Sequence, residues 1–144
     1  MDFFSTEQKK RILQEIREAE LDTSGEIRVH IENHCKAPEA FVRGIELFHK
    51  LSMHKTALRN GVLFYLALKD KKFAIVGDEG INAKLPSDFW DTIKTEMSTQ
   101  FKAGNFTEGL SGAIDKAGKQ LKTHYPYLND DKNELPDEIS FNNN

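Results

Sequence analysis

The sequence predicts an α/β domain in which a mixed central β-sheet, built from a βαβ crossover and a β-hairpin, is flanked by helices on both faces. Three stretches support this: residues 26–32 alternate apolar and polar side chains, residues 61–68 are almost uniformly apolar, and residues 72–76 follow after a short polar turn. A helix-sized segment separates the first two stretches, as parallel strands require. A short turn separates the last two, as in an antiparallel hairpin.

The first helix is expected to begin at Ser5, because Ser5 and Gln8 have the spacing of a capping box. Apolar residues then recur on one helix face, at Ile12, Leu13, Ile16 and Ala19. The strand at 26–32 follows. Its polar face is expected to be exposed or to line a site, and we expect His30 to face solvent. That face consists of Glu26, Arg28, His30 and Glu32.

The βαβ crossover is predicted from the next two segments. Pro38 suits the first turn of a helix. A helical stripe follows at Ala40, Phe41, Ile45, Phe48 and Leu51. A stretch as apolar as 61–68 is typical of a central strand that is covered on both faces. We therefore expect 26–32 and 61–68 to be parallel, and 72–76 to be antiparallel to 61–68.

Two more helices are expected after the hairpin, and they complete one domain over residues 1–126. The second of them spans 106–124. The first begins near Pro86 and turns a stripe inward that consists of Phe89, Trp90, Ile93, Met97 and Phe101. Residues 127–144 are polar and acidic, and we expect a flexible tail there, with Ile139 or Phe141 as its one apolar contact.

Composition excludes several classes of function. The formal net charge is −3, so the electrostatic attraction on which nucleic-acid binding depends is missing, and no nucleic acid is expected as a partner. Cys35 is the only cysteine, which excludes an intrachain disulfide. The sequence shows neither a signal-peptide pattern nor an apolar run of about 18 residues. We therefore expect a cytoplasmic monomer without a membrane anchor.

Carboxylates are predicted to gather at one edge of the sheet. In this topology strand 72–76 ends at the edge where strands 26–32 and 61–68 begin, so Asp78 and Glu79 should lie near Arg59 and Asn60. Calcium takes about six to eight oxygen ligands in irregular geometry, and magnesium takes oxygen ligands as well. The candidate metal ligands are Asp78, Glu79, Glu26, Asn82 and Asp88, with Arg59 and Asn60 as neighbours.

An alternative stays open for this acidic edge. Its residues are also typical of solvated turns, and Asp88 suits the first turn of a helix, where an acidic side chain interacts favourably with the helix dipole. On that interpretation no cation binds there.

The stretch NGVLFYLALKDKKFAIVGDEGIN, followed by PSDFWDTI, resembles the signature of the TPM-domain family. The segments FSTEQKKRILQEIREAE, SGEIRVHIE and FKAGNFTEGLSGAI are similar to family patterns too, so the resemblance covers about residues 3–125 and points to a soluble bacterial branch. It implies a doubly wound α/β layer. Some members are described as acid phosphatases of the thylakoid lumen, some bind calcium, and one branch modulates a membrane receptor. The resemblance carries the acidic loop over onto Asp78 and Glu79, beside Arg59, Asn60 and Gly61.

Two functions follow as hypotheses. The first is a calcium-binding TPM-like domain that acts as an interaction or regulatory module, with the divalent cation and an unidentified protein as partners. The alternative is a metal-assisted acid phosphatase acting on phosphomonoesters, in which the cation would polarise the phosphoryl group and Arg59 would offset its charge. Phosphate sites usually gather several cationic or amide donors. The sequence places only Arg59 near this edge, and Lys55 and Lys84 are further candidates whose positions it does not fix. Binding is therefore favoured over catalysis.

Overall fold

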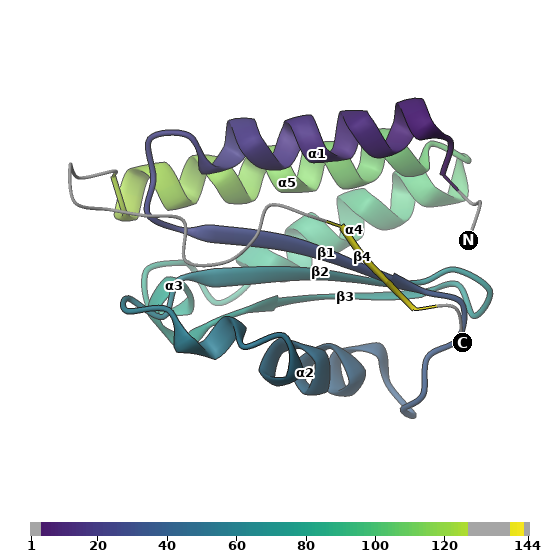
Figure 1. Cartoon of the computed structure of the whole chain (residues 1–144), viewed down its shortest axis with the longest axis horizontal. Helices are drawn as coiled ribbons and strands as arrows, with labels where there is room; N and C mark the ends of the chain where they lie inside the picture. The colour runs from purple at the N-terminus through teal and green to yellow at the C-terminus, as the bar shows by residue number, and fades with distance from the viewer. Residues whose placement is uncertain (1–3, 127–138, 143–144) are drawn as a thin grey trace.

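The computed structural model describes residues 4–126 and 139–142 of the chain. It confirms the predicted fold class, a mixed sheet with helices on both faces (Figure 1). In chain order the elements are α1 (Thr6–Glu20), β1 (Glu26–Glu32), α2 (Ala40–Lys50), the short 3₁₀ helix η1 (Met53–Lys55), β2 (Gly61–Ala67), β3 (Lys72–Gly77), α3 (Glu79–Asn82), α4 (Phe89–Lys102), α5 (Phe106–His124) and β4 (Ile139–Asn142).

The strand order is β3-β2-β1-β4 in a four-stranded sheet. Strands β1 and β2 are parallel, from Glu26 opposite Gly61 at one end to Glu32 opposite Ala67 at the other. Strand β3 is antiparallel to β2. Both pairings confirm the arrangement expected from the lengths of the connections.

Two apolar cores cover the two faces of the sheet. The larger core lies between the sheet and helices α1, α4 and α5, and the smaller one lies under α2 on the opposite face (Figure 1). Strand β2 is buried along its whole length because both cores reach it, as its uniformly apolar sequence predicted. Helix α1 begins with the predicted capping box, in which the backbone N–H of Gln8 donates to Ser5 Oγ at 3.1 Å and that of Ser5 donates to Gln8 Oε1 at 2.9 Å.

Helix α2 is turned differently from the prediction. Phe41 and Ile45 were expected to face inward, but they are 45% and 41% exposed, and the adjacent Val42 is 47% exposed. The buried face contains Gly44 instead, where an added Cβ would lie only 2.9 Å from Val76 Cγ2. The helix lies close to β3 at its glycine, and this contact turns the larger side chains outward.

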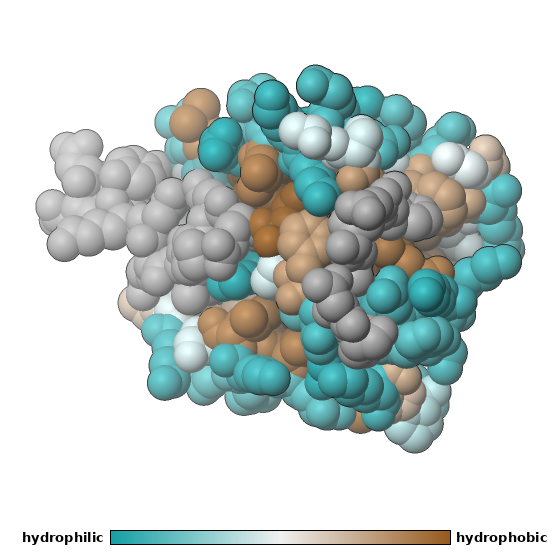
Figure 2. Space-filling view, turned by 45° about the vertical axis from the view of Figure 1, so that its right-hand side comes forward, coloured by the Kyte–Doolittle hydropathy of each residue, from teal (hydrophilic) through white to brown (hydrophobic). Residues whose placement is uncertain are grey.

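Figure 2 shows that apolar surface on the face in view (brown) is interrupted by hydrophilic surface (teal).

Helix α4 buries only part of the predicted stripe. Ile93 and Met97 are fully buried, whereas Phe89, Trp90 and Phe101 are half-buried and pack against the margin of the larger core. Trp90 donates its indole N–H to Asn82 Oδ1 at 2.7 Å, so this side chain has a polar partner at the surface. The expectation that Trp90 is a core residue was therefore wrong in part.

The C-terminal segment contributes a strand where a tail was expected. Residues Ile139–Asn142 form β4, which pairs in parallel with β1, with Ile139 opposite Val29. Ile139 packs against the larger core, while Phe141 is partly exposed, with Lys9 Nζ over its ring. The rest of the predicted tail, 127–138 and 143–144, lies outside the described residues. Within the described ranges, no helix is both long and apolar enough to cross a membrane.

Candidate functional site

The predicted acidic edge lies where β1 and β2 begin and β3 ends. Glu26 is opposite Gly61 in the register of β1 and β2, and the N–H of Asp78 donates to the carbonyl of Gly61 at 2.9 Å. Glu26, Gly61 and Asp78 therefore form a row across the sheet. The order and direction of the three strands place these residues at one edge of the sheet, and the register sets the row.

Arg59 connects two of the predicted ligands. Its guanidinium donates from Nε to Asp78 Oδ2 and from Nη2 to Asp78 Oδ1, both at 2.8 Å, and from Nη1 to Glu79 Oε1 at 3.1 Å. The hydrogen bonds to Asp78 raise the pKa of Arg59. The Asp78 side chain is nearly buried, but those of Arg59 and Glu79 are 40% and 73% exposed. The cluster is thus open to solvent on one side.

The loop after β3 is held tightly against the Arg59 turn. Asp78 caps the single helical turn α3, because its Oδ1 accepts the N–H of Glu79 at 2.8 Å. The N–H of Ile81 donates to the carbonyl of Arg59 at 3.2 Å, and the Ile81 side chain is fully buried. The two carboxylates of the cluster therefore lie on a fixed backbone.

Glu26 and Asn60 are buried beside this cluster. The carbonyl of Asn60 accepts the N–H of Glu26 at 3.4 Å, and its side-chain amide donates to Ser24 Oγ. The space over Gly61 is filled, because an added Cβ there would lie 3.3 Å from the carbonyl oxygen of Met53 and 3.6–3.7 Å from side-chain atoms of Met53 and Phe48.

The two remaining predicted ligands are placed around the start of α4. Asn82 donates its side-chain amide to the carbonyl of Gly77 at 2.7 Å and accepts from Trp90 through Oδ1. Asp88 occupies the N-cap of α4, although its side chain makes no capping hydrogen bond. These contacts hold α4 against the end of β3, and the role of either residue as a metal ligand stays a prediction.

A cation at this edge would take its carboxylate oxygens from Asp78 and Glu79. In the part of the chain that the structure describes, no group of three or more His, Cys, Asp or Glu side chains has the arrangement of a metal site. Any further ligands would have to be backbone carbonyls or water, which calcium accepts. A cation held by Asp78 and Glu79 would therefore be open to solvent.

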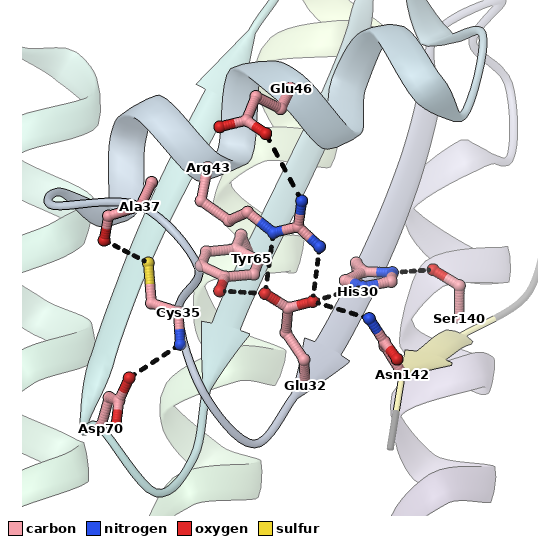
Figure 3. A network of polar contacts seen from close by, with 10 residues as sticks. All are labelled: His30, Glu32, Cys35, Ala37, Arg43, Glu46, Tyr65, Asp70, Ser140 and Asn142. Atoms are coloured by element: carbon pink, nitrogen blue, oxygen red, sulfur yellow. Dashed lines mark hydrogen bonds and ion pairs between the residues drawn. The ribbon is translucent and has the colours of Figure 1, made fainter. Parts of the chain in front are cut away.

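A second polar cluster lies at the other end of β1 (Figure 3). The Glu32 carboxylate is fully buried and accepts two hydrogen bonds from Arg43, from Nε and Nη2, at 2.9 Å each. Tyr65 Oη donates to it at 2.5 Å and Asn142 Nδ2 at 3.3 Å, while His30 Nε2 lies 3.6 Å away. One carboxylate thus connects strands β1, β2 and β4 with helix α2.

The pKa values in this cluster follow from its geometry. Burial by itself raises the pKa of Glu32, but the hydrogen bonds from Arg43 and Tyr65 outweigh burial and lower that pKa to about 2. Burial and the hydrogen bond to Glu32 raise the pKa of Tyr65, and burial lowers the pKa of His30. At neutral pH the cluster is a charged Glu32–Arg43 pair among neutral neighbours.

Comparison with known proteins gives the family. The profile of the TPM domain matches residues 1–120. The chain belongs to the TPM-domain family. This TPM domain is similar to the BA42 protein of the psychrophilic bacterium Bizionia argentinensis, solved by NMR, with 47% sequence identity and a TM-score of 0.88 over 98% of this chain and 97% of that chain.

Two more distant solved structures share the fold of this TPM domain. The N-terminal domain of a P. gingivalis protein has 20% identity and a TM-score of 0.69, over 88% of this chain and 83% of that chain. The N-terminal domain of the cg2496 protein of Corynebacterium glutamicum has 10% identity and a TM-score of 0.66, over 88% and 79%. A search of curated proteins gave no match.

The Glu32 cluster of this TPM domain was not predicted from the sequence. The polar face of β1 was expected to be exposed or to line a site, and His30 to face solvent, yet all seven residues of β1 are buried and His30 is 6% exposed. Two signals could have indicated it: charged residues alternating on a strand beside a fully apolar one, and Tyr65 inside that apolar stretch. Neither signal identifies Arg43 as the partner of Glu32, because Arg43 lies on the crossover helix α2 and not on a strand.

Proposed function

We propose that this TPM domain binds a divalent cation, calcium before magnesium, at the turn that carries Asp78 and Glu79, and that it acts as an interaction or regulatory module. The observation that carries the proposal is that one guanidinium, that of Arg59, holds both carboxylates. Two adjacent carboxylates repel each other without a positive charge. Arg59 provides that charge from within the chain, in a place where a bound cation would compete for it.

Exchange of Arg59 for a cation is favoured by exposure. Ion pairs open to solvent contribute little net free energy, so breaking the contact of Arg59 with Glu79 costs little. The two hydrogen bonds from Arg59 to the nearly buried Asp78 are the stronger contact, and the bound cation would have to replace their charge. Freed from both carboxylates, Arg59 would turn toward solvent and alter the charge of this surface. A partner protein that contacts this surface would then meet a different charge in the cation-bound domain than in the free domain.

The geometry favours binding over phosphomonoester hydrolysis. A phosphoryl group needs several convergent donors. Arg59, the predicted phosphate contact, directs its Nε, Nη1 and Nη2 donors to carboxylates. The acidic residues around it would also repel a phosphate dianion.

The test is a residue-by-residue NMR titration with calcium chloride and then magnesium chloride. We expect saturable amide shifts at residues 59–61 and 77–82. Arg59→Gln should bind calcium more tightly than the parent, because the competing charge is gone, and Asp78→Asn should lose binding. Asp91→Asn, at an exposed acid in the first turn of α4, is the matched control and should bind as the parent does.

Two outcomes would overturn the proposal. Calcium affinity that is the same in the parent, Arg59→Gln and Asp78→Asn would place the cation elsewhere. Cation-dependent turnover of a generic phosphomonoester that Asp78→Asn abolishes would favour the phosphatase instead.

A further inference from the structure

A cavity of about 460 Å³ lies on the side of the sheet covered by α4 and α5, between the β2–β3 hairpin and the α4–α5 turn. Figure 1 shows these two turns at the same end of the molecule, the end opposite α3. Three half-buried phenylalanine rings form its apolar wall, with ring centroids 5.1 Å apart for Phe73 and Phe101 and 5.3 Å apart for Phe101 and Phe106. Leu66 near the end of β2 and Leu68 just after it extend this wall.

The rim of the cavity is positively charged. Lys71 and Lys102 line it, and Lys94 Nζ lies 5.7 Å from the centroid of the Phe73 ring. No described acidic residue lines the cavity, and none of these three lysines forms an ion pair with a described residue. Lys72 also lines it, but its Nζ donates to the carbonyl of Pro38 on the opposite side of the sheet. On a chain whose net charge is −3, the two lining lysines, with Lys94 beside Phe73, make a local site for an anion.

We propose that this cavity binds a small amphiphilic carboxylate, a molecule with a medium-length alkyl chain. The alkyl chain would lie against the phenylalanine rings, and the carboxylate would lie between Lys71 and Lys102. Cavities of roughly 300–1,000 Å³ with an apolar lining and a few polar groups are typical of small-molecule sites. The cavity also lies outside the carboxyl end of β2, where α/β sheets commonly bind ligands.

The shape of the site favours a free molecule over a membrane surface. A membrane-binding face presents apolar side chains that project into the lipid. Here Phe73, Phe101 and Phe106 are half-buried and border a hollow. The site is also independent of the proposed cation site, which lies at the Gly61 end of β2, whereas the cavity lies at the Ala67 end.

The experiment is an NMR titration of the full chain with sodium decanoate below the concentration at which decanoate aggregates. We expect saturable amide shifts at Leu68, Phe73, Phe101 and Phe106. Decyltrimethylammonium, which has the same alkyl chain and the opposite charge, should not bind there, and neither should acetate, which has the charge without the chain.

Two kinds of variant separate charge from shape. Lys71→Glu with Lys102→Glu should weaken decanoate binding at least tenfold, and the matched reversal of two exposed lysines far from the cavity, Lys50→Glu with Lys84→Glu, should leave it unchanged. Ser98→Phe should block the cavity and abolish binding without a change of charge. Amide spectra of each variant confirm that it is folded.

The proposal would be overturned by affinity that survives both Lys71→Glu/Lys102→Glu and Ser98→Phe, or by shifts confined to other parts of the chain. Binding to anionic phosphatidylglycerol vesicles without binding to monomeric decanoate would identify a membrane surface in place of a ligand site.

Discussion

At the scale of single residues, Glu32 is a fully buried carboxylate whose charge the fold must stabilise. A fully buried carboxylate is tolerated only where its desolvation is offset, and here Arg43 and Tyr65 offset it. Unlike the contact between Arg59 and Glu79, this pair is closed to solvent, because neither Glu32 nor Arg43 is exposed. Its role is therefore to hold α2 and the sheet in one arrangement.

Arg43→Met should destabilise the domain by about 3–5 kcal/mol, because it leaves Glu32 buried without its cation. The double variant Glu32→Gln/Arg43→Met should recover at least half of that loss, since no uncompensated charge remains and the glutamine still accepts from Tyr65. Arg17→Met, at an exposed arginine of α1, should stay within about 0.5 kcal/mol of the parent. Urea unfolding measures all three, and a double variant no more stable than Arg43→Met would contradict this account.

Acid should destabilise the domain through Glu32. The pKa of this group is about 2 in the folded chain against its ordinary 4.5, so the unfolded chain binds more protons between these values. The stabilisation is complete above pH 4.5 and is lost as pH falls toward 2. Burial also lowers the pKa of His30, which adds a loss that begins below about pH 6.5.

The free energy of unfolding, measured against pH, tests this dependence. Glu32→Gln should be less stable than the parent at pH 7, and it should lose less stability between pH 4.5 and 2. Parallel curves for the two proteins in that range would show that other carboxylates govern the acid response.

At the scale of elements, close backbone contacts decide how the short elements are placed. Helix α3 has one turn, and it stays in place because Gly80 lies directly against the chain at Leu58 and Arg59. The same kind of contact at Gly44 orients α2 against β3. Neither glycine has a backbone in the left-handed region. Glycine is therefore needed at both positions because a Cβ would not fit there.

Gly80→Ala should destabilise the domain by about 1–3 kcal/mol, because the added Cβ would lie 2.2 Å and 2.5 Å from the carbonyl oxygens of Leu58 and Arg59. Gly112→Ala is the matched control. It lies inside α5 with nothing within 4 Å of the added Cβ, so it should stabilise the domain by about 0.4–1 kcal/mol. Thermal unfolding compares the two, and equal effects of the same sign would show that α3 does not depend on this contact.

At the scale of the whole molecule, the two ends of β2 carry different chemistry. The Gly61 end has the exposed acidic cluster around Arg59, and the Ala67 end has the buried Glu32 network on one face and the lysine-rimmed cavity on the other. Because β2 is buried throughout, it holds these regions at fixed positions relative to one another.

Calcium should stabilise the whole domain if it binds only the folded chain. At a hundredfold excess over the dissociation constant, mass action adds about 2.7 kcal/mol to the free energy of unfolding. Thermal unfolding in calcium and in chelator measures this gain. At one fixed calcium concentration Arg59→Gln should gain more than the parent and Asp78→Asn should gain nothing. Identical melting of the parent in both conditions would mean that the acidic edge is a solvated turn.

Much of this protein was determined by its sequence alone. Periodicity predicted the helices, since the capping box at Ser5 and the apolar recurrence after it depend on neighbours three or four residues apart. Connection lengths predicted the strand pairings, and topology predicted that Asp78 and Glu79 would meet Arg59. Each of these depends on local spacing or on the order of elements, which can be seen along the chain.

Only the tertiary structure decided which faces are buried and which partners meet. The exposure of Phe41 and Ile45 follows from the contact of Gly44 with β3, and the burial of His30 follows from elements that lie far from β1 in the sequence. The Ser140 hydroxyl that contacts His30 Nδ1 comes from β4, 110 residues further along the chain. Such contacts depend on the packing of side chains between distant segments. Hydrophobic periodicity is a local property of the sequence, so it does not predict them.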